Sequence, residues 1–153
     1  MIERRRRLMM GKDNYLEGWQ MDKGLSTIGD EISQVGNILS PYFYGVSGKT
    51  LYFRVWKGER PVKSYNAIEG FDTSGNVIVR RNQYLDNGTI SYSNFIADRL
   101  RVVCRASDID DCYIYDMSNA HYIFAGKNID TSTPPNKLII NYLCGLPAER
   151  RAA

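Results

Sequence analysis

Between Ser40 and Asn128 the chain consists of short segments rich in aromatic and β-branched residues, most of which end at a turn signal. Segments of this kind are typical of β-strands. The expected strands are 41–46, 50–56, 65–72, 77–81, 89–92, 100–106, 112–117 and 121–125. No stretch of about ten residues in this region has a 3.6-residue apolar period. Crossover helices, and with them a parallel sheet, are therefore not expected.

The segment 100–106 has the clearest alternation, and successive side chains of a strand point to opposite faces. The side predicted to face a core carries Leu100, Val102, Cys104 and Ala106. The side predicted to be mostly solvated carries Arg99, Arg101, Val103 and Arg105. One face of the sheet is therefore expected to be apolar and buried, and the other to be mostly exposed to solvent.

The connections between these segments predict hairpins. Segments 46–49, 72–76 and 86–88 supply residues that tolerate a positive φ or bond back to their own backbone. Short antiparallel strands bury one face against a second sheet. We therefore expect an all-β fold, an antiparallel β-sandwich of jelly-roll type. The length of 153 residues suits one such domain with tails.

The basic charge is concentrated in a short N-terminal arm. Residues 1–12 contain five basic residues and one acidic residue, so the rest of the chain is nearly neutral although the whole chain carries +3. We expect a basic arm over 1–14, a sandwich over 15–129 and a C-terminal extension over 130–153. The arm is interpreted as a cationic docking peptide, with a solvated tail or the start of a short helix as the alternative. The docking residues are Arg4, Arg5, Arg6, Arg7, Leu8, Met9 and Met10.

Several classes of protein are not expected. The apolar segment 8–10 is too short for a secretion signal, no stretch predicts a transmembrane span, and the neutral body argues against nucleic-acid binding. Cys104, Cys112 and Cys144 lack metal-ligand spacing and a CxxC motif. Cys104 is expected to be a core residue, and the free thiols fit folding in a reducing cytoplasm.

The chain offers little for catalysis, so neither an enzyme nor a cofactor is expected. His121 is the single histidine, and at the start of an aromatic strand it is interpreted as a rim or pairing residue rather than a general base. Asp108, Asp110 and Asp111 are weak candidates for a Ca²⁺ site. We favour the interpretation that they open a tight turn.

The order of four segments carries a resemblance to a known family. The segments are SPYFYGVSGKTLYF (40–53), YNAIEGFDTSGNVI (65–78), LRVVCRASDIDDCYIYD (100–116) and HYIFAGKN (121–128). In this order they resemble the galactose-binding-like jelly-roll modules of structural proteins from phages and prophages of gut bacteria, especially Bacteroides and its relatives. The segment ERRRRLMM (3–10) is similar to Arg-rich openings in proteins of those phages.

The resemblance implies a virion component, namely a head fibre, a capsid-decoration protein or a tail appendage, that assembles in the bacterial cytoplasm. Its arm would dock on other virion proteins, and a dimer or trimer is expected. The alternative is a carbohydrate-binding module of a tail or cell-surface adhesin, in which exposed aromatic side chains line a groove for a host-surface glycan. The candidate glycan contacts are Trp19, Tyr42, Tyr44 and Trp56.

The end of the chain has two interpretations. Segment 131–136 (TSTPPN) is a linker by composition, because Pro134 and Pro135 oppose a helix or a central strand. The apolar run 137–146 (KLIINYLCGL) follows it. This run is either a core strand or a segment that packs on a neighbouring subunit.

Overall fold

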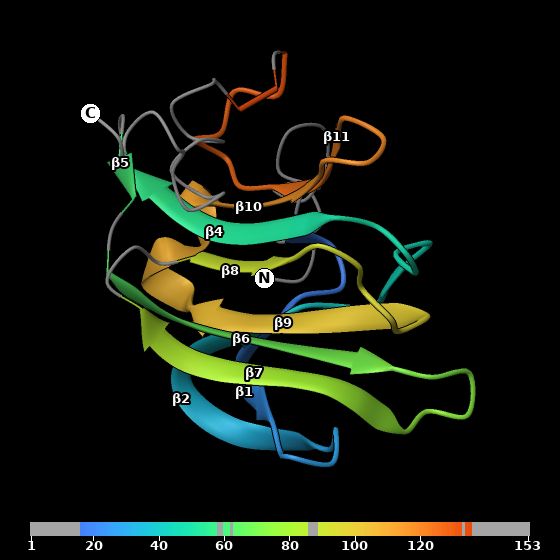
Figure 1. The fold of residues 1–153 in the computed structure, drawn as a ribbon. Coiled ribbons are helices and arrows are strands. Elements are labelled where there is room, and N and C mark those ends of the chain that lie inside the picture. The colour runs from blue at the N-terminus through green and yellow to red at the C-terminus, as the bar shows by residue number, and fades with distance from the viewer. Residues whose placement is uncertain (1–15, 58–59, 62, 86–88, 133, 136–153) are drawn as a thin grey trace.

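The computed structural model describes residues 16–57, 60–61, 63–85, 89–132 and 134–135. They form two antiparallel β-sheets in two layers (Figure 1). Sheet A has the order β1-β2-β9-β6-β7, with β3 also paired to β9, and sheet B has the order β11-β10-β4-β5, with β8 also paired to β4. The strands of sheet A are β1 (Gln20–Leu25), β2 (Glu31–Leu39), β3 (Phe43–Tyr44), β6 (Ser64–Phe71), β7 (Val77–Leu85) and β9 (Arg99–Arg105). Those of sheet B are β4 (Leu51–Lys57), β5 (Arg60–Pro61), β8 (Thr89–Tyr92), β10 (Cys112–Asp116) and β11 (His121–Ala125). The expected all-β, antiparallel architecture is confirmed.

The main core lies between the two sheets. Leu100, Val102 and Cys104 of β9 are fully shielded from solvent, as their alternation predicts. They share one apolar cluster with Phe53 of β4 and Ile114 of β10. Complete burial of a large apolar side chain contributes about 1.5–3 kcal/mol, so this cluster is the main source of the domain's stability.

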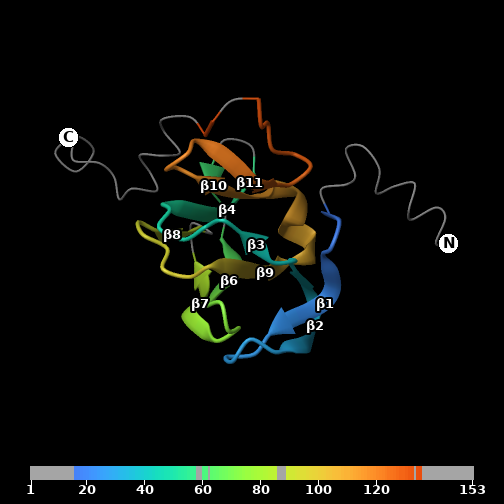
Figure 2. The same ribbon diagram turned by 90° about the vertical axis from the view of Figure 1, so that its right-hand side faces the viewer.

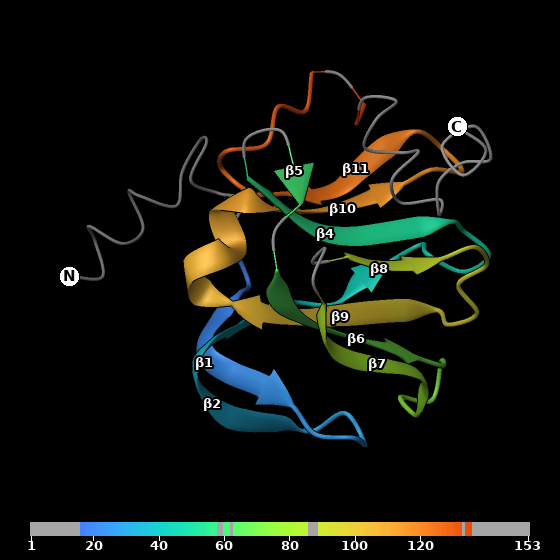
Figure 3. The same ribbon diagram turned by 60° about the vertical axis from the view of Figure 1, so that its left-hand side comes forward.

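A short 3-10 helix, η2 (Ala106–Asp111), carries the chain from β9 in sheet A to β10 in sheet B (Figure 3). Its residue Ile109 is buried. The Ser64 hydroxyl donates to Oδ2 of Asp108 (2.7 Å), which ties the helix to β6. The tight turn predicted for this acidic segment is therefore a short helix, and the preceding strand ends at Arg105.

The first hairpin, β1–β2, lies outside the strands predicted from the sequence, which begin at residue 41. Its turn is held by Ser26, whose hydroxyl accepts the backbone N–H of Asp30 (3.0 Å). Gly29 in the same turn has a φ of 88°, a value that favours glycine. The sequence STIGD at 26–30 was therefore an available turn signal.

This hairpin is sharply bent in its middle. Gly36 (φ 89°) and Asp22 (φ 59°) are both in the left-handed region, and the Gly36 N–H donates to Oδ1 of Asp22 (2.9 Å). The register between the two strands also shifts here. Beyond the bend the hairpin lies over the outer face of sheet A (Figure 2). A Cβ atom at position 29 would collide with the ring of Phe71, so glycine allows the close approach.

The bent hairpin covers a second, smaller core on the outer face of sheet A. The buried members of this second core are Leu25, Leu39, Ala67, Phe71 and Val103. Arg101 lies on the same face and is only 4% exposed. Its Nε donates to the carbonyl oxygen of Ser40 (2.9 Å) and its Nη1 to Oε2 of Glu31 (3.0 Å). The prediction that this side of β9 is mostly solvated is wrong at Arg101 and Val103, because the hairpin shields them.

Two of the three predicted hairpin turns are described, and one of them, 72–76 between the paired strands β6 and β7, is confirmed. In segment 72–76, Oδ1 of Asp72 accepts two backbone N–H groups of the turn (2.9 and 2.8 Å). Segment 46–49 is a turn, closed by a backbone hydrogen bond of 3.2 Å between its end residues. The hairpin predicted there is wrong, because the turn carries the chain from β3 in sheet A to β4 in sheet B. The predicted turn 86–88 lies outside the described residues.

Other predictions are modified or lie beyond the described residues. The predicted strand 41–46 is reduced to β3, because Gly45 (φ 72°) turns the backbone away from the extended conformation. The docking residues, Arg4 to Met10, and the apolar run 137–146 are outside the described residues.

Candidate functional site

The four aromatic residues predicted to contact a glycan do not gather in one groove of the described structure. Trp19 packs at the edge of the main core, with its ring centroid 4.7 Å from that of Phe124. Tyr42 belongs to the second core, on the opposite face of sheet A. Tyr44 is its neighbour (ring centroids 6.2 Å apart) and is 68% exposed. Trp56 lies in β4, and its side chain is outside the described residues.

The three aspartates considered as Ca²⁺ candidates lie on η2, and two of them bond to other parts of the domain. Asp108 accepts the Ser64 hydroxyl, and Oδ1 of Asp111 accepts Nδ2 of Asn128 (3.0 Å). Within the described residues, no group of three or more His, Cys, Asp or Glu side chains could hold a metal ion. Asp108 and Asp111 therefore stabilise the connection between the two sheets.

A pocket of about 350 Å³ lies beside β10, β11 and the segment that follows them. Its lining residues are Tyr115, Ala120, His121, Tyr122, Thr131, Ser132 and Pro134. The rings of Tyr115 and Tyr122 meet edge to face, with centroids 4.8 Å apart. Burial, with the nearby Tyr113, Tyr115 and Asp130, raises the pKa of Tyr122 to about 12. Its hydroxyl therefore keeps its proton over the physiological pH range.

The alternation of β10 places tyrosines beside this pocket. Ile114 points into the main core, whereas Tyr113 and Tyr115 form a separate aromatic cluster that includes Tyr122. Tyr115 pairs directly with Tyr122 across the two strands. The turn that joins the strands contains Ala120 in the left-handed region (φ 55°). The register of this hairpin therefore forms one side of the pocket, and Thr131, Ser132 and Pro134 form the rest.

Asp116 anchors the hairpin next to the pocket and is 1% exposed. Its Oδ1 accepts the backbone N–H groups of Ser118 (2.8 Å) and Asn119 (3.2 Å), and its Oδ2 accepts Nδ2 of Asn119 (3.0 Å). Lys49 Nζ lies 3.6 Å and His121 Nδ1 3.8 Å from the same Oδ2. Burial alone would raise the pKa of Asp116, but the hydrogen bonds from Asn119 and Ser118 and the charge of Lys49 hold it below its usual value.

His121 lies beside the Asp116 carboxylate at the edge of the hairpin. Its side chain is 55% exposed and it pairs with Asp116 across the hairpin, so the structure places it at a strand rim as predicted. The hydrogen-bonding capacity of the Asp116 carboxylate is taken up largely by the turn. A carboxylate that orients a catalytic histidine would instead be directed at the imidazole.

The chemistry of the pocket lining suits binding of a small polar molecule. The lining combines the aromatic residues Tyr115 and Tyr122 with the hydroxyl-bearing residues Thr131 and Ser132. Apolar surface with a few polar groups is typical of ligand pockets. No carboxylate is among the lining residues that the structure describes, whereas glycoside hydrolysis usually needs two. The pocket could not be predicted from the sequence, because its lining comes from a hairpin and from residues after it in the chain. The tyrosines of β10 and β11 were the available sequence signal for an aromatic lining.

Asp116→Asn is expected to lower the free energy of unfolding at pH 7 by about 1–3 kcal/mol, because a charged acceptor of three hydrogen bonds is lost. The pKa of Asp116 is lowered in the folded state, so the stability that this carboxylate contributes is present above the unfolded pKa and is lost as the pH falls through the folded pKa. The difference between wild type and variant should therefore shrink below about pH 4.

Urea unfolding followed by circular dichroism at pH 7 and pH 3 measures this difference. Asp98→Asn, at an exposed position, is the matched control and should be close to wild type at both values. A difference between Asp116→Asn and wild type that stays constant with pH would contradict the role given to the Asp116 charge.

Comparisons with known proteins add no relative. A scan against protein-family models, a search of curated proteins and a search of solved structures each gave no match. In the part of the chain that the structure describes, no helix is long and apolar enough to cross a membrane. Function is therefore inferred from the residues of the chain itself.

Proposed function

We propose that this protein is a non-catalytic structural component of a virion, a head fibre or capsid-decoration protein that displays a β-sandwich of jelly-roll type. Its N-terminal arm would dock on other virion proteins after synthesis in the bacterial cytoplasm. The sequence resemblance to phage proteins and the basic arm support a place in a virion. The two-sheet architecture is compatible with a displayed domain.

The observation that carries an assembly role is a set of exposed large apolar residues on segments that meet at one end of the sandwich. These residues are Ile28 (72% exposed), Tyr44 (68%), Ile96 (62%) and Ile78 (43%). Tyr44 and Phe71 pair with Arg99 from its two sides, and Gly29 lies against Phe71 and Val77. The ends of β3, β6, β7 and β9 and the β1–β2 turn therefore meet here. Aromatic and large apolar side chains beside an arginine are typical of protein–protein interfaces.

The polar groups at the pocket support a role without catalysis. Asp116 holds a turn through three hydrogen bonds, and His121 is the half-exposed cross-strand partner of that carboxylate. General acid–base catalysis needs a titratable group within hydrogen-bond reach of the substrate and tuned by its neighbours. We therefore expect His121→Ala to leave the biological role intact.

Deleting Met1–Met10 is expected to leave a folded domain and to abolish incorporation into the virion, because the arm carries the excess charge outside the sandwich. The measurement compares the amount of chain in gradient-purified particles with the amount in the cell extract. Circular dichroism of the truncated chain checks that it is folded.

A variant with lysine in place of Arg4, Arg5, Arg6 and Arg7 serves as the charge-matched control. Because it keeps the positive charge, partial or full incorporation is expected. Normal incorporation of the truncated chain would contradict docking through the arm.

Saccharide binding is a second candidate function, favoured by the aromatic and hydroxyl-bearing lining of the pocket. Under this alternative the protein is a carbohydrate-binding module, and Tyr122→Ala should abolish the glycan binding that wild type shows on an array. Tyr44→Ala, at an exposed position outside the pocket, should keep it. Absence of binding by wild type would remove this candidate.

A further inference from the structure

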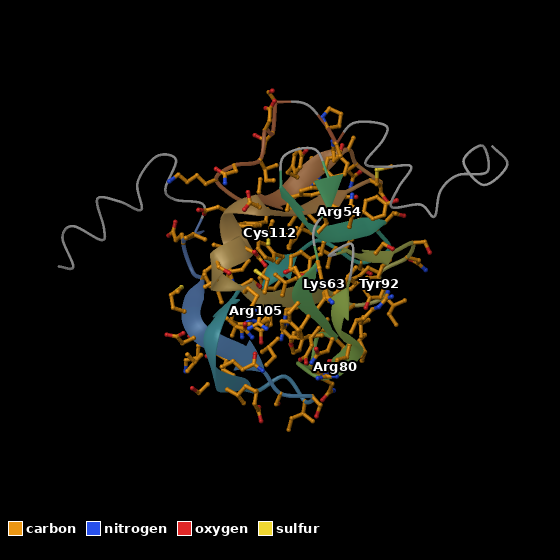
Figure 4. All side chains as sticks on the ribbon, turned by 90° about the vertical axis from the view of Figure 1, so that its left-hand side faces the viewer. Arg54, Lys63, Arg80, Tyr92, Arg105 and Cys112 are labelled. Carbon is orange, nitrogen blue, oxygen red and sulfur yellow. The ribbon has the colours of Figure 1, made fainter. Side chains whose placement is uncertain are left out.

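Two cysteines from opposite sheets meet inside the main core. Cys104 on β9 and Cys112 on β10 have no solvent exposure, and both are free thiols. Their Sγ atoms are 3.7 Å apart. Figure 4 shows Cys112 at the end of η2, in the interior of the domain. Two oxidisable groups are thus in contact across the space between the sheets.

The backbone around this pair is held in place by neighbouring strands. Cys104 pairs with Ile38 of β2 on one side and with Asn66 of β6 on the other. Cys112 pairs with Val55 of β4, and its thiol donates to the carbonyl oxygen of Asp108 (3.2 Å). A disulfide has an S–S bond of about 2.05 Å, so the sulfur atoms must approach each other by about 1.7 Å. Such a movement requires rotation about the χ1 bonds of the two cysteines.

We propose that Cys104 and Cys112 are an oxidative modification site, at which a low-molecular-weight disulfide such as oxidised glutathione converts the two thiols into a disulfide bond between sheets A and B. The thiolate of one cysteine attacks the small disulfide and releases one small thiol. The thiolate of the second cysteine then attacks the protein sulfur of the mixed disulfide and releases the second small thiol. The protein loses two electrons and two protons, and the small disulfide is reduced to two thiols.

The exchange takes place when the domain folds or opens locally. Both thiols are shielded, and burial raises the pKa of the Cys112 thiol, so little reactive thiolate exists in the closed domain. Outside the cell, where conditions are oxidising, the product would persist as a covalent link in the core. Because the sulfur contact belongs to the domain itself, the disulfide is expected whether or not the domain is part of a virion.

The test uses full-length Cys144→Ser, which removes the third thiol, unfolded in urea and refolded to equilibrium in a glutathione redox buffer. After alkylation of free thiols and trypsin digestion, peptide 102–105 should be linked to peptide 106–127, with the mass of two hydrogens lost. The midpoint of thermal unfolding should rise by about 5 °C or more relative to the reduced protein. Reduction with dithiothreitol should reverse both changes.

Cys104→Ala combined with Cys144→Ser is the matched control and should show neither the linked peptides nor the rise in midpoint. Equilibrium through the unfolded state gives the oxidant full access to both thiols. Alkylation of both Cys104 and Cys112 after oxidative refolding would therefore overturn the proposal. A linked form with a lower unfolding midpoint than the reduced protein would also overturn it, because the bond would then distort the native contact.

Discussion

Arg101→Asp is expected to lower the free energy of unfolding by several kcal/mol, because it removes a buried guanidinium from its half-exposed partner Glu31 and puts an unpaired carboxylate in its place. Arg101 is 4% exposed. It donates to Ser40 and Glu31, and it pairs in register with Glu69. An aspartate at this position would remove the guanidinium that bonds Glu31 and would place a carboxylate beside Glu69, whose remaining partner is Arg80. Single domains have only about 5–15 kcal/mol of stability, so the variant should unfold at a much lower urea concentration than wild type.

Arg105→Asp is the matched control, because Arg105 lies on the same face of the same strand and is exposed. Its expected effect is within about 0.5–1 kcal/mol. Urea unfolding of both variants, followed by far-ultraviolet circular dichroism, gives the comparison. If Arg101→Asp were as stable as Arg105→Asp, the bent hairpin would not cover this face of sheet A in solution.

Leu100→Asp is expected to prevent folding altogether, at a cost of several kcal/mol. Leu100 is fully buried in the main core. An unpaired carboxylate there would either stay charged without water around it or become protonated, and both outcomes cost free energy. The variant should show the circular dichroism spectrum of an unfolded chain and no cooperative unfolding transition. Val102→Asp should behave in the same way, because Val102 is buried in the same cluster.

Ile96→Asp is the control for this change, since it introduces the same side chain at an apolar position that is 62% exposed. It should fold with nearly wild-type stability. A folded, cooperative Leu100→Asp variant would contradict the assignment of the inner face of β9.

The inner face of β9 could be predicted from the sequence because strand alternation is a local signal. Leu100, Val102 and Cys104 were placed in the core by their period of two, and the structure confirms all three. The outer face could not be predicted in the same way. Arg101 is buried by a hairpin whose bend depends on Gly36 and Asp22, and that contact joins parts of the chain far apart in sequence.

The candidate site could be predicted only in part, because it too depends on contacts between distant parts of the chain. The sequence predicts His121 at a strand rim, where the structure has it, but it does not predict the nearby carboxylate of Asp116. The pocket depends on the pairing of Tyr115 with Tyr122 and on the segment that contains Thr131 and Ser132. Neither the contact between two sheets at Cys104 and Cys112 nor this pocket can be derived from spacing alone, because both depend on tertiary packing.

The most direct test of the proposed virion role is the composition and structure of purified particles released by cells that encode this chain. Peptide mass spectrometry of gradient-purified particles should find the chain at a fixed ratio to the other virion proteins. Electron cryomicroscopy should show density for a two-sheet sandwich on the particle exterior, with residues 1–14 in contact with the particle. A chain that stays in the soluble fraction while the other virion proteins sediment would contradict the proposed role.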